Sequence, residues 1–418
     1  MSGLEVYDIY IKFREFIVGG KNMKNKFGKL VTSVLVSCMM VSMLGGCGAK
    51  DKESAASGEY KSDGVETYMI GGIGPVTGDA AIYGQAVKNA AELAVKEIND
   101  AGGINGVQIS FQFEDDEHDA EKSVNAYNAL KDWGMKILMG TVTSKPCTAV
   151  SAKTKADNMF QLTPSGSAVE CIANDNAFRV CFSDPNQGSA SANYIGTKGL
   201  AKKVAVIYNS SDVYSSGIYE TFAEEAKNQD FEIVAEEAFT NDSATDFSVQ
   251  IQKAKDAGAE LVFLPMYYKE ASLILTQADT IGYKPLFFGC DGLDGLLNVE
   301  NFDTSLAEGV MLLTPFVADA TDDKTVAFVN AYKAAYNETP NQFAADAYDA
   351  IYIIKAAIEK SGAKPDAPIS TICEQLKSAM TEITVDGVTG TITWTADGEP
   401  DKTPKAMVIS GGTYKAID

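Results

Sequence analysis

The feature that most constrains the fold is an alternation of short apolar runs with segments of helical periodicity, which begins at Thr67. The run 68–70 precedes a glycine-rich turn, and apolar residues then recur at the helical period over 87–98, with Gly102 placed to cap the helix. Further strand-like runs occupy 107–113, 137–139, 204–207, 233–234, 261–264 and 286–288, and 123–133 has a helical pattern. Strands spaced by helices indicate βαβ units with parallel sheets. About eight units exceed a comfortable single sheet, so we predict two α/β lobes.

Ligands of such sheets bind in the loops beyond the carboxyl ends of the strands. These loops are where we expect the functional residues. The sequence places them at 71–78, 140–144, 163–167, 209–214, 265–269 and 289–292.

The composition excludes several classes of function. The 418 residues carry a net charge of −22 with no basic patch, so we expect no nucleic-acid partner. The only histidine, His118, lies in the acidic run 114–119, which we interpret as the solvated entrance to a helix, with a hydrated cation as the alternative. The glycines after the first apolar run match a dinucleotide loop poorly, and no phosphate loop or serine nucleophile elbow is present. We therefore expect that the protein is not an enzyme and that it binds no cofactor and no metal.

The N-terminal residues have the pattern of a targeting signal. A lysine cluster precedes an uncharged apolar run, 30–44, which is too short to span a bilayer as a helix. The following Gly45-Gly46-Cys47 resembles a lipobox, which predicts a signal peptide over 1–46 and a lipidated Cys47; a plain signal peptide is the alternative. Met23 is a second candidate start. Residues 48–64 are small and polar, so 47–64 are expected to form a lipid-anchored tether.

Five cysteines remain in the mature chain, and none forms a CxxC pair, so a metal site is not expected. Cys171 and Cys181 are close enough in sequence to form a disulfide in an exported protein. Buried free thiols are the alternative.

The strand-end loops contain groups of complementary chemistry. Residues 140–144 lead into a helix whose N-terminus can receive a small anion, with Thr143 or Ser144 as the N-cap, and 163–167 add further hydroxyls. Asp291 stands at another strand end, where an acid can meet a cation. Tyrosines at 83, 214 and 267 can supply aromatic walls. Together these loops suit a zwitterion with an apolar side chain.

At this point the sequence resembles the leucine/isoleucine/valine-binding proteins of ABC transporters. The resemblance is strongest in the string from Glu97 to Gly106, Glu-Ile-Asn-Asp-Ala-Gly-Gly-Ile-Asn-Gly, and covers nearly all of residues 65–415. It extends through Gly74-Pro75-Val76-Thr77-Gly78, Tyr83-Gly84, Glu114-Asp115-Asp116, Thr163-Pro164-Ser165, Phe178-Arg179, Asp184-Pro185-Asn186-Gln187-Gly188 and Gly390-Thr391-Ile392-Thr393-Trp394.

The resemblance implies a role for each candidate residue. The family's carboxylate-binding serine falls on Ser144, while Ser165 would offer its carbonyl to the ligand ammonium and Ser167 would contact both charged ends. Three tyrosines would line the pocket for the ligand side chain, namely Tyr83, Tyr214 and Tyr267. Tyr268 is the alternative to Tyr267. The family's ammonium-binding glutamate falls on Asp291, whose side chain is one methylene shorter. Three consequences are possible: the lobes close further, a water bridges Asp291 and the ammonium, or the ligand differs.

The resemblance also implies a type I periplasmic-binding-protein fold, in which two Rossmann-like parallel-sheet lobes are joined by a hinge with the ligand in the cleft. Its chain crossings place lobe 1 at 65–185 plus 315–400 and lobe 2 at 186–314 plus 401–418. We expect a monomeric lipoprotein on the outer face of the membrane that delivers leucine, isoleucine or valine to an ABC permease and its ATPase. A sensor subunit, or a receptor for another solute such as an aromatic acid or amide, is the alternative.

Overall fold

The computed structural model describes residues 66–417, and every structural statement below concerns these residues. The predicted signal peptide, the predicted lipidation site at Cys47 and the predicted tether lie outside them. Within the described residues, no helix combines the length and the apolar character needed to cross a membrane.

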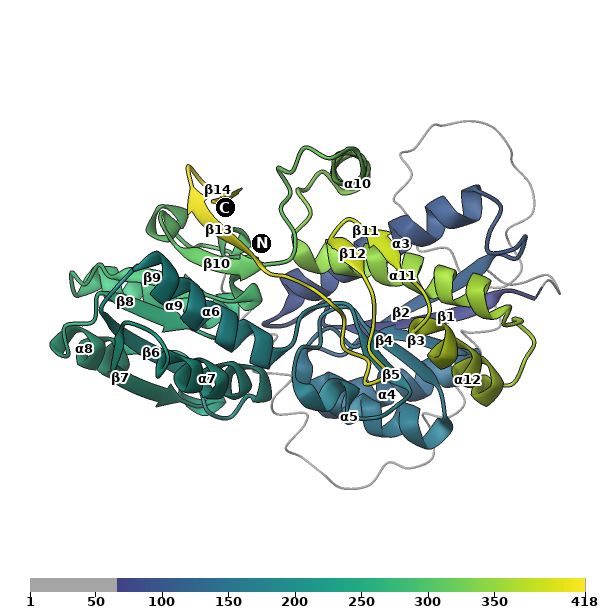
Figure 1. Cartoon of the computed structure of the whole chain (residues 1–418), viewed down its shortest axis with the longest axis horizontal. Helices are drawn as coiled ribbons and strands as arrows, with labels where there is room; N and C mark the ends of the chain where they lie inside the picture. Colours follow the sequence, from purple (N-terminus) through teal and green to yellow (C-terminus); the bar gives the residue numbers. More distant parts are fainter. Residues whose placement is uncertain (1–65, 418) are drawn as a thin grey trace, which may run out of the picture. The chain divides into compact units, whose positions relative to one another are not determined.

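The first sheet contains five parallel strands in the order β2-β1-β3-β4-β5 (Figure 1). The strands are β1 (Tyr68–Gly74), β2 (Ile109–Asp115), β3 (Ile137–Gly140), β4 (Phe160–Thr163) and β5 (Ala177–Arg179). The connections are α3 (Ala81–Asp100), α4 (Ala120–Trp133), α5 (Ser144–Asp157) and the 3-10 turn η1 (Val169–Ile172). Strands β3 and β4 are buried along their whole length, as expected for parallel strands covered on both faces.

The second sheet contains seven strands in the order β14-β13-β10-β9-β8-β6-β7, of which only β13 and β14 are antiparallel to their neighbours. The strands are β6 (Lys203–Asn209), β7 (Glu232–Phe239), β8 (Leu261–Leu264), β9 (Leu286–Gly289), β10 (Met311–Thr314), β13 (Lys405–Ser410) and β14 (Thr413–Ala416). The helices are α6 (Asp184–Lys198), α7 (Val213–Ala226), α8 (Ser248–Asp256) and α9 (Tyr268–Thr280). Short 3-10 turns are η2 (Asn241–Ser243), η3 (Asp291–Leu293), η4 (Leu296–Asn298) and η5 (Thr304–Ala307).

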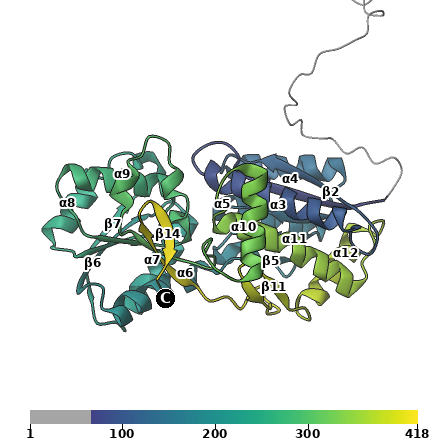
Figure 2. The same cartoon turned by 90° about the horizontal axis from the view of Figure 1, so that it is seen from above.

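After β10 the chain returns to the first sheet. It forms α10 (Asp323–Tyr336), α11 (Gln342–Ser361), α12 (Ile369–Met380) and the hairpin β11 (Val385–Gly387) with β12 (Gly390–Ile392). Helix α11 packs along α3, although the two are distant in sequence (Figure 2). The chain then crosses again and ends as β13, which pairs with β10, and β14, which pairs with β13 (Figure 1).

We call the first sheet with α3–α5 and α10–α12 lobe 1, and the second sheet with α6–α9 lobe 2. The chain passes between them at 180–183, 315–322 and 393–404. Lys402, on the third crossing, donates to the Val180 carbonyl on the first crossing (2.8 Å) and to Asp346 of α11 (2.7 Å). This buried ion pair links two crossings to lobe 1. The residue boundaries expected from the sequence remain a proposal.

The α/β architecture with two lobes of parallel sheet is thus confirmed. Helix α3 ends as predicted: Gly102 has φ +103°, its N–H donates to Asn99 O (3.0 Å), and the next N–H donates to Ile98 O (2.9 Å). This is a Schellman ending with glycine one position beyond the cap residue Ala101.

One expectation about the first strand was wrong. Residues Gly71–Gly74 were expected to form a turn, but they extend β1, and the turn begins at Pro75. A Cβ on Gly72 would lie 2.3 Å from Phe113, and one on Gly74 would lie 2.4 Å from Val142. The glycines therefore allow neighbouring side chains to pack closely on a buried strand.

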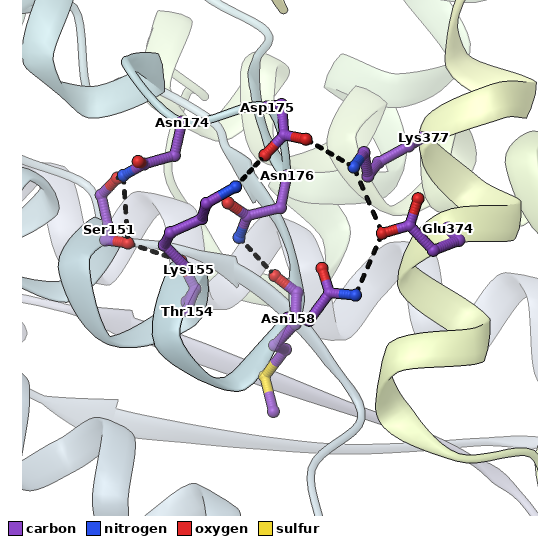
Figure 3. A network of polar contacts seen from close by, with 10 residues as sticks. Ser151, Thr154, Lys155, Asn158, Asn174, Asp175, Asn176, Glu374 and Lys377 are labelled. Atoms are coloured by element: carbon purple, nitrogen blue, oxygen red, sulfur yellow. Dashed lines mark hydrogen bonds and ion pairs between the residues drawn. The ribbon is translucent and has the colours of Figure 1, made fainter.

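The apolar core of the described residues divides into one large cluster and smaller ones. One cluster joins β1 and α3 of lobe 1 to α9 of lobe 2 and to α11, and smaller clusters fill the opposite face of each sheet. At the surface of lobe 1, a polar network ties the end of α5 to α12: Lys377 bonds Asp175 (2.8 Å) and Glu374 (3.3 Å), and Asn158 also reaches Glu374 (3.0 Å) (Figure 3).

Candidate functional site

A small cavity with an empty volume of about 220 Å³ lies between the two lobes. It is lined by Tyr83, Val142, Thr143, Ser144, Ser165, Ser167, Tyr214, Tyr267, Asp291, Gly292 and Phe343. All seven ligand-binding candidates from the sequence are in this lining. Tyr268, the considered substitute for Tyr267, is outside it.

The lobe 1 wall begins where β3 leads into α5. Thr143 is the N-cap of α5 and Ser144 its first residue, which resolves the two alternatives. The Thr143 side chain makes no capping hydrogen bond, and its Oγ1 lies 2.8 Å from Nδ1 of His118. The first amides of α5 are therefore left for another acceptor, and the helix dipole favours an anion there.

The second part of the lobe 1 wall is the loop after β4. Ser144 Oγ accepts from the amides of Ser167 (3.3 Å) and Ala168 (3.2 Å), which joins this loop to α5. Ser165 Oγ donates to Val142 O (2.6 Å), and Thr163 Oγ1 accepts from Gly166 N (2.8 Å). The loop is fixed by its own hydrogen bonds.

Arg179 holds the same loop from behind. Its guanidinium is fully buried and donates to the carbonyl oxygens of Gly166 (3.3 Å) and Ser167. Its Nε lies 3.1 Å from Glu399, and its own carbonyl accepts from Trp394 Nε1 (2.8 Å). The loop is thereby tied to the third chain crossing.

The lobe 2 wall presents an acid. Asp291 is 3% exposed and follows β9, as predicted. Its Oδ1 accepts from Tyr214 OH (2.6 Å), while Gly292 N donates to the same hydroxyl (2.9 Å). Burial raises the pKa of Asp291 to about 7, because no cation compensates its desolvation.

Aromatic rings close the remaining sides. Tyr214 and Tyr267 stack with ring centroids 4.8 Å apart and planes at 9°, and Tyr83 lies against Phe343 at 4.2 Å. The Tyr267 hydroxyl is buried and has no hydrogen-bond partner. A buried hydroxyl without a partner is costly, so this oxygen is available to a ligand.

The lobes touch directly beside the cavity. Tyr83 OH of lobe 1 donates to Gly292 O (2.5 Å) and accepts from Tyr268 N (3.2 Å), both in lobe 2. Lys269 of lobe 2 also pairs with Asp79 of lobe 1. The structure therefore shows a closed cleft.

Sequence reasoning did not select Asp184 or Phe343. Asp184 begins α6 and is 1% exposed; neither carboxylate oxygen has a hydrogen-bond partner. Burial raises its pKa well above the ordinary value, and the charge of nearby Asp291 raises it further, whereas Ser167 lowers it. Its place in the string 184–188 of the family resemblance was an available signal. Phe343 carries no such signal, because α11 reaches the cavity only through the fold.

The acidic run around His118 was interpreted partly correctly. Asp119 caps α4 by accepting from the amides of Glu121 and Lys122 (2.9 Å each), so the run is a helix entrance. It is not fully solvated, because Asp116 is buried and His118 contacts Tyr267. Among residues 66–417, no group of three or more acidic, histidine or cysteine side chains is arranged to hold a metal ion.

The structure also distinguishes between the two alternatives for Cys171 and Cys181, a disulfide or buried free thiols. Cys171 and Cys181 are buried free thiols in this structure, as are the other cysteines of the described chain. The second of the two alternatives describes them.

Comparison with known proteins gives the same picture. The periplasmic binding protein family model matches residues 67–412. The Leu/Ile/Val-binding protein homolog 3 of Brucella melitensis is 31% identical over 350 residues, 82% of this chain and 92% of that protein. The structure of LivJ, the branched-chain amino acid transporter substrate binding protein of Streptococcus pneumoniae, in complex with isoleucine, has a TM-score of 0.77 and 31% identity, covering 84% of this chain and 98% of that one.

A more distant structure shows the same fold. The R. palustris ABC transporter solute binding protein, in complex with benzoate, is 21% identical with a TM-score of 0.73 and covers 84% of this chain and 95% of that one. Members of the matched family are extracytoplasmic solute-binding proteins and not enzymes. The match over residues 67–412 establishes that this chain belongs to the periplasmic binding protein family, among the leucine/isoleucine/valine-binding proteins of ABC transporters.

Proposed function

We propose that this protein is the substrate-binding lipoprotein of an ABC importer and that it takes leucine, isoleucine or valine into the cavity between its lobes. The observation that carries the proposal is the opposition of charges across the cavity. Lobe 1 presents serine hydroxyls and a helix N-terminus, and lobe 2 presents the buried Asp291. A molecule that satisfies both walls carries an anion at one end and a cation at the other.

The ligand carboxylate is assigned to Ser144 and Ser167, where hydroxyls and helix amides converge. The ammonium is assigned to Asp291 with the carbonyl of Ser165. Aspartate is shorter than the glutamate of the family, and the buried carboxyl group of Asp184, whose oxygens are unpartnered, is a second acid close to Asp291. The ligand side chain then meets the rings of Tyr83, Tyr214 and Tyr267.

Two alternatives are less well supported. An aromatic acid such as benzoate has no cation to compensate Asp291, so its binding would leave a buried carboxylate unpaired. A sensor subunit would use the same cavity. The expected monomer, the lipid anchor at Cys47, and delivery to permease and ATPase subunits are part of the proposal.

A thermal-shift screen with chemically matched ligands tests the proposal. L-leucine, L-isoleucine and L-valine are compared with 4-methylpentanoate, which lacks the amine, and with 3-methylbutylamine, which lacks the carboxylate. An amino acid at 100 times its Kd should add about 2.7 kcal/mol to the free energy of unfolding. We expect both truncated analogues to stabilise much less. Stabilisation by benzoate or 4-methylpentanoate without any amino-acid effect would contradict the ligand assignment.

The anchor is tested separately. Replacement of Cys47 by alanine should release the protein from the membrane fraction while leaving amino-acid binding intact, because the tether is distant in sequence from the cavity residues. Retention of the Cys47→Ala protein on membranes would contradict lipidation at this residue.

A further inference from the structure

His118 occupies an unusual backbone position at the edge of the cavity. It has φ +60° and the preceding Glu117 has φ +49°, in the left-handed region that few side chains other than glycine adopt. Carboxylates hold this turn: Asp116 Oδ1 accepts from His118 N (2.9 Å), and Asp115 Oδ1 accepts from Glu117 N (3.0 Å). Left-handed conformations are unfavourable for residues other than glycine, so the turn persists because these bonds determine it.

The turn directs the His118 ring to both walls of the cavity. Its Nδ1 lies 2.8 Å from Thr143 Oγ1 of lobe 1, and its ring meets Tyr267 of lobe 2 edge-on, with centroids 5.3 Å apart and planes at 83°. Both Thr143 and Tyr267 line the cavity, whereas His118 does not.

We propose that His118 is a positioning residue that couples the anion-binding helix start of lobe 1 to the aromatic wall of lobe 2 when the cleft closes. The inference rests on the proposed function and adds a residue to it. By engaging the Thr143 hydroxyl, His118 fixes the orientation of that group, which makes no bond to the first amides of α5, so these amides stay free for the ligand carboxylate. By contacting Tyr267, it holds the ring that stacks on Tyr214, the hydrogen-bond donor to Asp291.

The ionisation of His118 depends on lobe closure. Burial lowers its pKa, and Lys145 acts in the same direction, while the acids that face it act in the opposite one. The charged groups around it are Asp119 beside it in the chain, Asp79 before α3, Lys145 on α5 and the buried Asp212 at the start of α7. Tyr267 packs on the ring from α9. An open cleft exposes the ring, so closure favours the neutral imidazole. Neutral His118 therefore contributes to the stability of the closed cleft above the ordinary pKa of about 6.5, and this stabilisation is lost as pH falls below that value.

The first test measures L-leucine affinity by calorimetry between pH 7.5 and pH 5.5. His118→Asn retains a hydrogen-bonding group at the Nδ1 position but does not titrate, and His118→Ala removes both contacts. Glu117→Gln, in the same turn, is the control. We expect His118→Ala to weaken binding roughly three- to tenfold at pH 7.5 and His118→Asn to recover part of it. The wild-type Kd should rise with falling pH by up to about tenfold per unit more than that of His118→Asn. Equal Kd values and equal pH profiles for all proteins would overturn the proposal.

The second test needs no ligand, because His118 is the single histidine of the chain and its imidazole NMR signal in untagged protein is unambiguous. We expect a depressed pKa, either in the protein alone or on addition of L-leucine, and a return toward about 6.5 in Tyr267→Ala. An ordinary pKa with and without L-leucine, unchanged by Tyr267→Ala, would overturn the cross-lobe contact. If no amino acid binds the wild type, the proposed function fails, and this titration still decides whether His118 contacts lobe 2.

Discussion

The two walls of the cavity are built differently. The wall of lobe 1 is held by bonds within its own lobe: Ser165 to Val142, Ser144 to Ser167, and Arg179 to the loop carbonyls. The wall of lobe 2 presents two tyrosine rings and one acid, and the Tyr267 hydroxyl in it has no partner. The anion side is thus preformed, whereas the cation side retains uncompensated polar groups.

This difference suggests an order of events. A ligand carboxylate can dock on lobe 1 without rearrangement, because the donors are already fixed there. Its ammonium can compensate Asp291 only when lobe 2 closes, so the ligand favours the closed form through contacts that the open form lacks. Changes to the lobe 2 wall should therefore alter affinity, and changes behind the lobe 1 wall should also alter stability.

The largest effect is expected from Asp291→Asn, which removes the charge but keeps the shape. We expect it to weaken L-leucine binding by about 2–5 kcal/mol, because the buried ammonium loses its closest ionised partner. The free energy of unfolding of the ligand-free protein should stay equal or rise, since a buried carboxylate is removed. Calorimetry and urea unfolding measure the two quantities.

Asp294→Asn is the matched control. Asp294 is buried three residues further along, but it accepts from the Gln342 amide (2.8 Å) and does not line the cavity. We expect its affinity to remain close to wild type. Unchanged amino-acid binding in Asp291→Asn would remove Asp291 from the site.

The next effect concerns the lobe 1 wall. Arg179→Gln leaves the buried carbonyl oxygens of Gly166 and Ser167 without their donor, so we expect it to lower the free energy of unfolding by about 2–4 kcal/mol and to weaken binding as well. Urea unfolding and calorimetry report both changes.

Lys377→Gln is the control, because it also replaces a long, positively charged side chain of lobe 1 by glutamine. Its partners Asp175 and Glu374 are solvent-exposed (Figure 3), so we expect a loss below about 1 kcal/mol and normal binding. If Arg179→Gln behaved like Lys377→Gln, the lobe 1 wall would not depend on its buried support.

The smallest effect, expressed per pH unit, is a pH dependence. The pKa of Asp291 is raised to about 7 in the fold, above the unfolded value of about 3.9. Between these pH values the folded protein holds a proton that the unfolded chain has lost, so the stability contributed by protonated Asp291 falls as pH rises through this window. The slope for one group is at most about 1.4 kcal/mol per pH unit.

Urea unfolding of the ligand-free protein at several pH values should therefore show a shallower decline for Asp291→Asn than for the wild type. Other buried acids, including Asp294 and Asp346, contribute in the same direction to both proteins, so the difference isolates Asp291. Ser144→Ala, in the lobe 1 wall, adds or removes no titrating side chain and should keep the wild-type slope. Identical slopes for wild type and Asp291→Asn would show that Asp291 is not desolvated.

Much of the fold was predictable because local sequence patterns indicate its strands and helix ends. Parallel strands buried on both faces appear as apolar runs, and Gly102 marks the end of α3 through its positive φ. Gly71–Gly74 were misinterpreted, because glycine favours a turn locally whereas here close packing against Phe113 and Met135 requires it within β1. That requirement exists only when the neighbouring elements are in place.

The candidate site divides in the same way. Loops at the carboxyl ends of strands can be located from the chain alone, and the family resemblance assigned Ser144, Tyr214 and Asp291, which the structure brings to one cavity. Asp184 could have been chosen only from its place in the family string 184–188, and Phe343 could not be chosen by pattern, since an aromatic ring in a helix is common.

The sequence by itself determined the alternating architecture, the loops that carry the site and the residue types that suit a zwitterion, because each depends on residues adjacent in the chain. Only the tertiary structure decided which groups face one another. It left Asp291 without a cation, fixed Ser167 through Arg179 and set His118 between Thr143 and Tyr267. Burial and distance set the strength of such interactions, and both arise only when segments far apart in the chain pack together.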